Sequence, residues 1–299
     1  MSKITHLSPE WQSWILENLG RGCTPQSVVE VMVEKNFDPM FASAIVFHFV
    51  SSGNSGAGGL PGPAIPGAQS AQQRAIQSGY VYETPRFPQA GSVIRTGDRD
   101  VRVVVRMEKP VVAVLDGLLS QEECDELIRL SANKLKRSTI VDPQTGREEV
   151  IDDRTSLGTF FSLRENEFIA RLDERVSQLM HWPVENGEGL QILNYRVGGE
   201  YKPHYDYFPE QDPGSHVHLK SGGQRVSTLV MYLNDVDEGG ETIFPEMGLS
   251  VSPKKGSAVY FEYCNSQGQV DPLTLHGGAP VIKGEKWIAT KWMRQRIFG

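Results

Sequence analysis

The sequence predicts an α+β fold, in which helices pack against an antiparallel β sandwich or barrel, plus a small all-α domain at the N-terminus. Three observations predict this class. Apolar residues recur at helical spacing over residues 5–50, a Gly- and Pro-rich stretch follows, and short β-rich runs dominate the chain after residue 101. Helices followed by many closely spaced strands favour segregated layers over alternating βα units.

The length and charge of the chain limit what it can be. Its 299 residues suffice for a domain near 200 residues plus a smaller one. With 30 Lys and Arg against 37 Asp and Glu, the formal net charge is −7, so we expect no nucleic-acid partner. No apolar run approaches the roughly 20 residues needed to span a bilayer, so we expect no membrane association.

The number and spacing of the cysteines indicate whether the protein is expected in a reducing or an oxidising compartment. Cys23, Cys124 and Cys264 are far apart and form no C-x-x-C motif. This pattern supports neither a disulfide framework nor a zinc knuckle, and a reducing compartment is the default. We therefore expect a cytoplasmic protein.

The first region is helical. Ser8-Pro9, Thr24-Pro25 and Asp38-Pro39 each place a capping side chain before a proline suited to the first helical position. We expect a three-helix N-terminal domain over residues 1–50, either a structural module or one that docks a partner or mediates self-association. Residues 51–100 are expected to be a Gly/Pro-rich linker followed by an irregular segment partly docked on the region after it.

The second domain is expected over residues 101–299. Strands are predicted at 101–105 and 110–115, a helix opens at the capping box Ser120-Gln-Glu-Glu123, and another amphipathic helix covers 168–179. After residue 191 the runs QILNYRV, STLVMYLND, GSAVYFEY and KWIATKWM all indicate strands.

One histidine differs from the rest by its neighbours. The segment from Tyr201 to Phe208 has the pattern of a strand, so His204 and Asp206, two residues apart, are expected on one face. They would supply two thirds of the 2-His-1-carboxylate triad that holds non-haem Fe(II). His276, after a strand-like run at 272–275 and before a Gly-Gly turn, is the leading candidate for the third ligand. His216-x-His218 is a weaker metal candidate in an expected loop.

A lysine strengthens the metal hypothesis. In the run from Lys286 to Trp292, period 2 places Lys286, Ile288, Thr290 and Trp292 on one face. A lysine on an otherwise apolar inward face needs an anionic partner or loses its charge. Beside a metal site, it suits a dicarboxylate that binds the metal with one end and the ammonium with the other.

These residues lie in a context that resembles a known family. The runs LQILNYRVGGEYKPHYDYF, GGQRVSTLVMYLNDVDEGGETIFP and LHGGAPVIKGEKWIATKW, with PVVAVLDGLLSQEECDELIRLS and DDRTSLGTFF upstream, closely resemble the catalytic domain of prolyl 4-hydroxylases, which are Fe(II)/2-oxoglutarate dioxygenases. The resemblance covers about residues 105–296 and implies a double-stranded β-helix, or jelly-roll, core. Residues 1–100 resemble no family that we recognise.

The resemblance also implies roles for individual residues. His204, Asp206 and His276 would bind Fe(II), and Lys286 would pair with the distal carboxylate of 2-oxoglutarate, with O2 as the second cosubstrate and ascorbate as a candidate reductant. The other implied site residues are Tyr195, Thr242 and Trp292 for the cosubstrate and Tyr201 and Arg225 for the substrate. Arg225 is alternatively a surface charge at the start of a strand.

The expected activity is hydroxylation of a peptidyl proline to 4-hydroxyproline, with release of succinate and CO2. Two other functions stay open: hydroxylation of a free amino acid or other small molecule, and a non-catalytic ligand-binding sandwich. Residues 208–223 follow the metal ligands and are long for a hairpin, so they are either a substrate lid or a mobile surface loop. A peptide or protein substrate is the expected partner.

Overall fold

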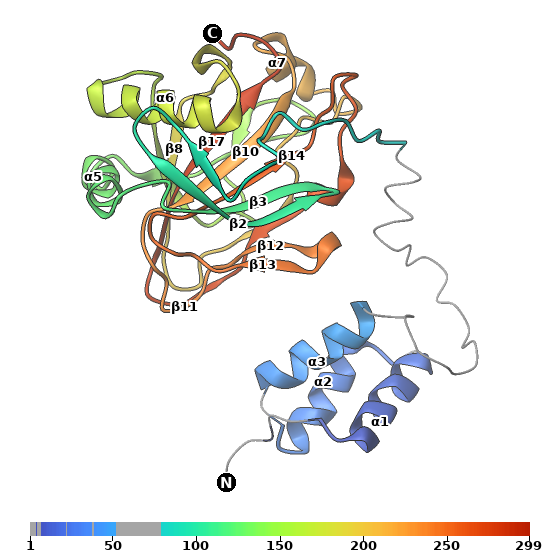
Figure 1. Ribbon diagram of the computed structural model, residues 1–299. Coiled ribbons are helices and arrows are strands. Elements are labelled where there is room, and N and C mark those ends of the chain that lie inside the picture. The colour runs from blue at the N-terminus through green and yellow to red at the C-terminus, as the bar shows by residue number, and fades with distance from the viewer. Residues whose placement is uncertain (1–3, 5–6, 22, 38, 52–78) are drawn as a thin grey trace. The chain divides into compact units, whose positions relative to one another are not determined.

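The computed structural model describes residues 4, 7–21, 23–37, 39–51 and 79–299. The chain separates into two units, residues 1–68 and 69–299, shown in Figure 1. None of the helices in the described ranges is long and apolar enough to cross a membrane.

Three helices make up the described part of the first unit. They are α1 (Pro9–Gly20), α2 (Pro25–Glu34) and α3 (Pro39–Ser51), each beginning at the proline that the sequence indicates. The hydroxyls of Ser8 and Thr24 cap α1 and α2, while the expected cap Asp38 lies outside the described residues. The helices share a core of their own, made by Ile15, Val28, Met32, Phe37, Ala42 and Val46.

The second unit is built on two antiparallel sheets (Figure 1). The nine-stranded sheet has the order β1 (Val93–Arg95), β2 (Asp100–Glu108), β3 (Val111–Asp116), β14 (Ala258–Glu262), β10 (Arg225–Tyr232), β17 (Lys286–Arg294), β8 (Leu190–Tyr195), β7 (Leu157–Phe161), β4 (Lys136–Arg137). The four-stranded sheet has the order β13 (Leu249–Val251), β12 (Thr242–Phe244), β15 (His276–Gly278), β9 (Tyr201–His204). Two short pairs complete the strands: β5 (Ile140–Val141) with β6 (Glu148–Glu149), and β11 (Glu238–Gly239) with β16 (Val281–Lys283).

The two faces of the large sheet have different partners. One face packs against α5 (Gln121–Ser131) and α6 (Glu167–Met180), with Leu127 and Leu179 of those helices buried in a single core with strand residues. The other face packs against the small sheet, where Phe244 and Phe261 meet edge to face with ring centroids 5.2 Å apart. The jelly-roll core expected from the sequence is therefore present, and the space between its sheets is available for a site.

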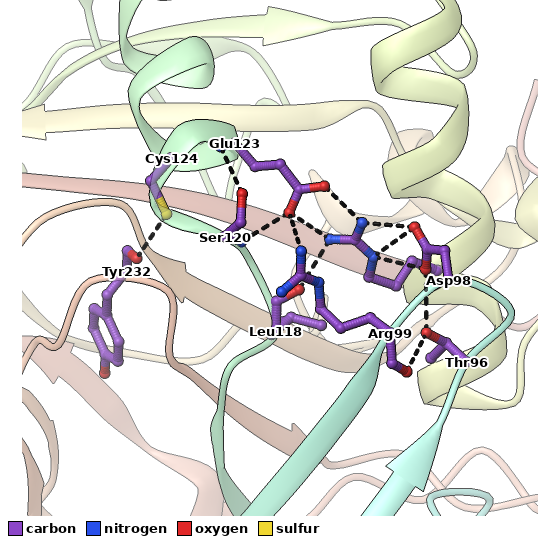
Figure 2. Close-up of polar contacts among 9 residues, drawn as sticks. Thr96, Asp98, Arg99, Leu118, Ser120, Glu123, Cys124 and Tyr232 are labelled. Carbon is purple, nitrogen blue, oxygen red and sulfur yellow. Dashed lines mark hydrogen bonds and ion pairs between the residues drawn. The ribbon is translucent and has the colours of Figure 1, made fainter.

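A buried arginine ties α6 to α5 and to the turn between β1 and β2. The guanidinium of Arg175 lies 2.6 Å from a carboxylate oxygen of Asp98 and 2.6 Å from one of Glu123. Arg99 lies 3.4 Å from the same Glu123, and Figure 2 shows the side chains of Arg99 and Glu123 next to each other. Glu123 also closes the predicted capping box with Ser120 at the start of α5.

The expected boundary at residue 101 is wrong in its details. Strand β1 lies within residues 79–100, which the sequence indicated as irregular, whereas the buried Phe87, 1% exposed, agrees with the partial docking expected for this segment. The Phe87 ring stacks on Tyr260 at 4.6 Å between centroids. Isolated aromatic residues without a period give no sequence signal for a segment that is held by side-chain packing. Residues 52–78, which include most of the expected linker, lie outside the described residues.

Three local expectations near the site are also corrected. Residues 208–223 contain the short helix α7 (Ser215–Lys220), so His216 and His218 lie on a helix and not in a loop. The run before His276 is the 3-10 helix η3 (Pro272–Thr274) and not a strand. The Gly277-Gly278 pair, expected as a turn, belongs to strand β15. Pro272 begins η3, and Gly277 and Gly278 lie in a strand that is paired on both sides, so these residues did not mark a loop or a turn.

Candidate active site

Two neighbouring strands of the small sheet bring the histidines together. Strand β15 pairs with β9 so that His276 lies directly opposite His204. The strand β9 ends at His204, and Asp206 follows in a bend that turns its carboxylate back toward both imidazoles. Nε2 of His276 lies 3.4 Å from Oδ2 of Asp206, and Nε2 of His204 lies 3.7 Å from Oδ1.

Hydrogen bonds orient each member of this triad. Nδ1 of His204 lies 2.8 Å from the carbonyl oxygen of Lys202, and Nδ1 of His276 lies 2.9 Å from that of Thr274. A carbonyl only accepts, so each Nδ1 carries the hydrogen, which in the neutral imidazole leaves the lone pair on Nε2. The hydroxyl of Thr228 donates to Oδ2 of Asp206 at 2.7 Å.

The protonation states of the triad suit a cation. Burial and the neighbouring His276 lower the pKa of His204 to about 3, against the opposing effect of Asp206. Burial raises the pKa of Asp206, but His276 and His204 outweigh this effect and hold the pKa well below its usual range. A neutral imidazole and an ionised carboxylate are the forms that bind a metal.

The donor set fits a 2-His-1-carboxylate metal centre. The ligand atoms of His204, Asp206 and His276 lie within 4.8 Å of one another, the one such cluster found in the described part of the chain. Two nitrogens and one oxygen gathered at one side of a cavity leave further coordination positions open, as non-haem Fe(II) centres require. The competing pair does not join it, since Nε2 of His218 lies 2.9 Å from the carbonyl oxygen of Gly146.

Lys286 lies in the same cavity as the triad. It begins β17, and its side chain is 3% exposed. Within the described ranges its ammonium has no ion pair; Nζ lies 5.6 Å from the ring centroid of Tyr195 and 5.9 Å from that of Tyr232. Burial lowers the pKa of Lys286 to about 8, although Glu241 acts in the opposite direction. An ammonium in this position is a strong site for a carboxylate.

Hydroxyl groups surround the lysine. Tyr195 lies directly opposite Lys286 on the neighbouring strand β8, and burial raises its pKa against the effect of Arg154. Thr242 of β12 is buried on the facing sheet and accepts a hydrogen bond of 2.7 Å from the hydroxyl of Tyr232. Tyr232 was not predicted as a site residue. It ends β10, which is far from β17 in the sequence, and the pairing of β10 with β17 brings it close to Lys286.

The alternation predicted for β17 is confirmed, but Lys286 is not its single buried cation. Ile288, Thr290 and Trp292 line the cavity with Lys286, whereas Lys291 points to the opposite face. There Lys291 is 1% exposed, and its ammonium lies 2.7 Å from Asp173 of α6. Arg294 is also buried and lies 3.1 Å from Glu188. The sequence could not reveal these acidic partners, which come from distant segments.

Arg225 is held in place by an acidic partner. Its guanidinium pairs with Glu188 through two contacts, at 2.7 Å and 2.9 Å, and lies 3.9 Å above the ring of Trp292. NH1 of Arg225 also donates to the carbonyl oxygen of Asp206 at 3.3 Å. Arg225 thus lines the cavity and is not a surface charge. The indole nitrogen of Trp292 has no hydrogen-bond partner among the described residues, so a bound ligand can accept from it.

Tyr201 and Arg154 form the opposite side of the cavity. The ring of Tyr201 stacks on His204 with centroids 3.5 Å apart, and the guanidinium of Arg154 lies 4.8 Å above Tyr201. Arg154, which sequence reasoning missed, is anchored by its donation to the carbonyl oxygen of Thr139 at 2.8 Å and to Gln191 at 3.0 Å. All nine residues predicted for the site line one cavity of about 980 Å³.

Comparison with known proteins gives the same class. A family model described as the 2OG-Fe(II) oxygenase superfamily matches residues 190–294. Prolyl 4-hydroxylase 5 of Arabidopsis thaliana is 41% identical over 221 residues, which are 68% of this chain and 74% of that protein. Probable prolyl 4-hydroxylase 10 of the same plant is 40% identical over 223 residues, 67% of this chain and 75% of the relative.

A solved structure is also similar. It is a viral collagen prolyl hydroxylase from Paramecium Bursaria Chlorella virus-1 in complex with 2OG, at 31% identity and a TM-score of 0.49, covering 61% of this chain and 95% of that one. From the sequence relatives, the chain belongs to the prolyl 4-hydroxylase family of 2OG-Fe(II) oxygenases. It is a dioxygenase that uses Fe(II), 2-oxoglutarate and O2.

Proposed function

We propose that the protein hydroxylates a proline residue within a peptide or protein, and that His204, Asp206 and His276 hold the Fe(II). The observation that carries this assignment is the presence of the triad and of the unpaired ammonium of Lys286 in one cavity. When bound, Fe(II) supplies the oxidising chemistry by which 2-oxoglutarate, O2 and a C–H bond give succinate, CO2 and a hydroxylated product.

The side chains around the triad position the cosubstrate. Lys286 pairs with the distal carboxylate of 2-oxoglutarate, and Tyr195 and Thr242 donate hydroxyl hydrogens to the same group. Support comes from the bond in which Tyr232 donates to Thr242, because it leaves the hydroxyl hydrogen of Thr242 free to point toward the lysine pocket. Trp292 lies farther along β17, opposite Thr228 and beneath Arg225, and lines the same cavity near the triad.

A second set of side chains positions the ligands themselves. Thr228 engages one carboxylate oxygen of Asp206 and so leaves Oδ1 for the metal. Arg225 fixes the backbone at Asp206 and, with Tyr201, faces the part of the cavity where substrate enters. We propose that these two residues contact the peptide, Tyr201 through its ring edge, because His204 and Arg154 cover its faces, and Arg225 through the cation held above Trp292.

The size and charge of the cavity favour a peptide over a free amino acid. About 980 Å³ is more than 2-oxoglutarate and one small substrate need. A free amino acid also needs a carboxylate partner close to the triad, and the two arginines there are engaged: Arg225 pairs with Glu188 in two contacts, and Arg154 donates to Thr139 and Gln191. The names of the relatives, all prolyl 4-hydroxylases, support the same substrate class.

Succinate release with a panel of substrates tests this function. Proline-containing peptides should stimulate release above the rate without substrate and gain the mass of one oxygen atom on proline. Strong stimulation by free L-proline, with none by any peptide, would establish the small-molecule alternative. Omission of ascorbate in the same assay tests its proposed role as the reductant that maintains Fe(II).

For the N-terminal unit we propose a small all-α domain over residues 1–50 that docks a partner or mediates self-association. The separate core of α1, α2 and α3 supports this proposal. Light scattering of the full chain and of a variant lacking residues 1–68 separates the two roles. A fall in the number of chains per particle on deletion indicates self-association, and an unchanged number leaves docking.

A further inference from the structure

The cavity extends along a row of paired strand residues to the edge of the large sheet. Ile288 of β17 pairs with Leu193 of β8, Leu193 with Gly158 of β7, and Gly158 with Lys136 of β4. Directly paired residues of antiparallel strands share a face, so the row is continuous. All four residues line the cavity, and β4 is the last strand of the sheet.

The outer part of this row is shaped as a trough. Gly158 contributes no side chain, and a Cβ atom there would approach Leu193 to 2.9 Å. Beside it, Phe160 of the same strand is 57% exposed although it lines the cavity. A large aromatic side chain left exposed beside a bare backbone is a surface for apolar groups of an extended ligand.

Positive charge gathers at the end of the trough. Lys134, Lys136 and Arg137 all line the cavity there, and none of them has an ion pair among the described residues. Arg137 makes one hydrogen bond, to the carbonyl oxygen of Ile151 at 3.3 Å. Apart from Asp206, two acidic residues line the cavity, Asp212 and Glu148, and Glu148 accepts a hydrogen bond from Thr139 at 3.1 Å. This basic group contrasts with the net charge of −7 of the whole chain.

We propose that this edge arm, formed by Lys134, Lys136, Arg137, Gly158 and Phe160, receives the residues next to the target proline and selects peptides that carry Asp or Glu there. The inference rests on the proposed function, because it concerns the substrate of the same site. Unpaired cations at a cavity mouth attract an acidic segment and disfavour a basic one. Phe160 then packs against the apolar part of the same segment.

Three matched peptides test the inference. All three have the same length and proline content. The residues that flank the target proline are Glu in the first peptide, Gln in the second and Lys in the third. We expect kcat/KM for coupled succinate release to be roughly three- to tenfold higher for the Glu peptide than for the Lys peptide, as a few solvent-exposed pairs predict. The difference should shrink as salt is added.

A charge reversal gives the sharper readout. In the Lys134→Glu/Lys136→Glu variant the preference should invert in favour of the Lys peptide. Misfolding cannot produce this result, because it lowers kcat/KM for both peptides and leaves their ratio unchanged. Lys283→Glu, an exposed lysine of β16 outside the cavity lining, should keep the wild-type preference. Peptides that stimulate equally whatever their charge would overturn the inference alone. Failure of every peptide to stimulate would overturn the proposed function, and the inference with it.

Discussion

In the proposed function, the ammonium of Lys286 sets the pH range in which the cosubstrate binds. Burial lowers its pKa to about 8, with Glu241 opposing, so the free enzyme carries the charge below that pH and loses it above. Above pH 8 a dicarboxylate must bind together with a proton. We expect the apparent affinity for 2-oxoglutarate to fall about tenfold per pH unit on that side, measured by equilibrium titration of the metal-loaded enzyme.

Two substitutions at Lys286 provide the control. Lys286→Arg should flatten the profile, because a guanidinium stays charged. Lys286→Met should weaken 2-oxoglutarate binding about ten- to a hundredfold on the acidic side of the profile and remove the pH dependence. A wild-type affinity that is constant across pH 8 would contradict the assignment.

Thr228 is a positioning residue for Asp206. Its hydroxyl donates to Oδ2 of Asp206 at 2.7 Å and contacts the hydroxyl of Tyr263 at 2.9 Å. Thr228→Val keeps the shape and removes these bonds, so we expect Fe(II) affinity to fall about tenfold or more, as measured by metal titration. Thr228→Ser should restore most of the affinity, and equal affinity in the Val and Ser variants would show that the hydroxyl does not orient the ligand.

At the scale of elements, the strap formed by residues 79–88 supports the segment that carries His276. Asn265 donates to the carbonyl oxygen of Val81 at 3.0 Å, and the hydroxyl of Tyr82 donates to Asp271 at 2.7 Å. Asp271 in turn caps η3, directly before His276. The strap thus reaches the segment of His276, a proposed metal ligand, through the buried carboxylate of Asp271.

Two truncations separate the strap from the N-terminal unit. Deleting residues 1–78 should leave Fe(II) binding and uncoupled 2-oxoglutarate turnover intact, because the strap remains. Deleting residues 1–88 also removes Phe87 from the core, a loss of about 3 to 5 kcal/mol of stability for a buried aromatic side chain. We expect that protein to bind Fe(II) poorly and to melt at a lower temperature. Equal behaviour of both truncations would rule out the supporting role.

The ion cluster of Arg175 links three elements and makes stability depend on pH. Hydrogen bonding from Arg175 lowers the pKa of Asp98, and for Glu123 the same arginine outweighs the rise caused by burial. Carboxylates with lowered pKa values stabilise the fold above their unfolded values, near 4, and lose this contribution as the pH falls further. Arg175→Met should therefore cost about 3 to 5 kcal/mol at neutral pH and less in acid.

Chemical denaturation at several pH values measures this effect. Arg129→Met is the matched control, since Arg129 pairs with Glu126 on the exposed side of α5. It should change the free energy of unfolding by less than about 1 kcal/mol at every pH. A penalty for Arg175→Met that does not shrink in acid would show that the loss comes from packing and not from the ion pairs.

For the whole molecule, the sequence predicted those parts of fold and site that depend on local pattern. Period 2 along β17 placed Lys286 in the cavity, and the H-x-D spacing brought His204 and Asp206 together even though the strand stops at His204. The positioning residues were not predicted. Thr228, Tyr232 and Glu188 act through strand pairing and long-range ion pairs, which leave no periodic signal in the sequence.

The same limit applies to segments held by isolated contacts. Phe87 and Tyr82 attach the strap through single side chains, so their sequence context looks irregular. In α7, the surrounding prolines and glycines concealed a helix of six residues. A local sequence pattern predicts helices and strands that have a repeating buried face. Very short helices and segments held by one or two side chains can be recognised only in the tertiary structure.

The central claim is that one cavity couples the decarboxylation of 2-oxoglutarate to hydroxylation of a peptidyl proline. The most direct measurement incubates the full-length protein with Fe(II), 2-oxoglutarate, isotopically labelled O2 and a proline-rich peptide, and follows both products by mass spectrometry. We predict one labelled oxygen on proline for each succinate formed above the rate without peptide. Succinate formed at the same rate with and without peptide, and a peptide that gains no labelled oxygen, would contradict the account.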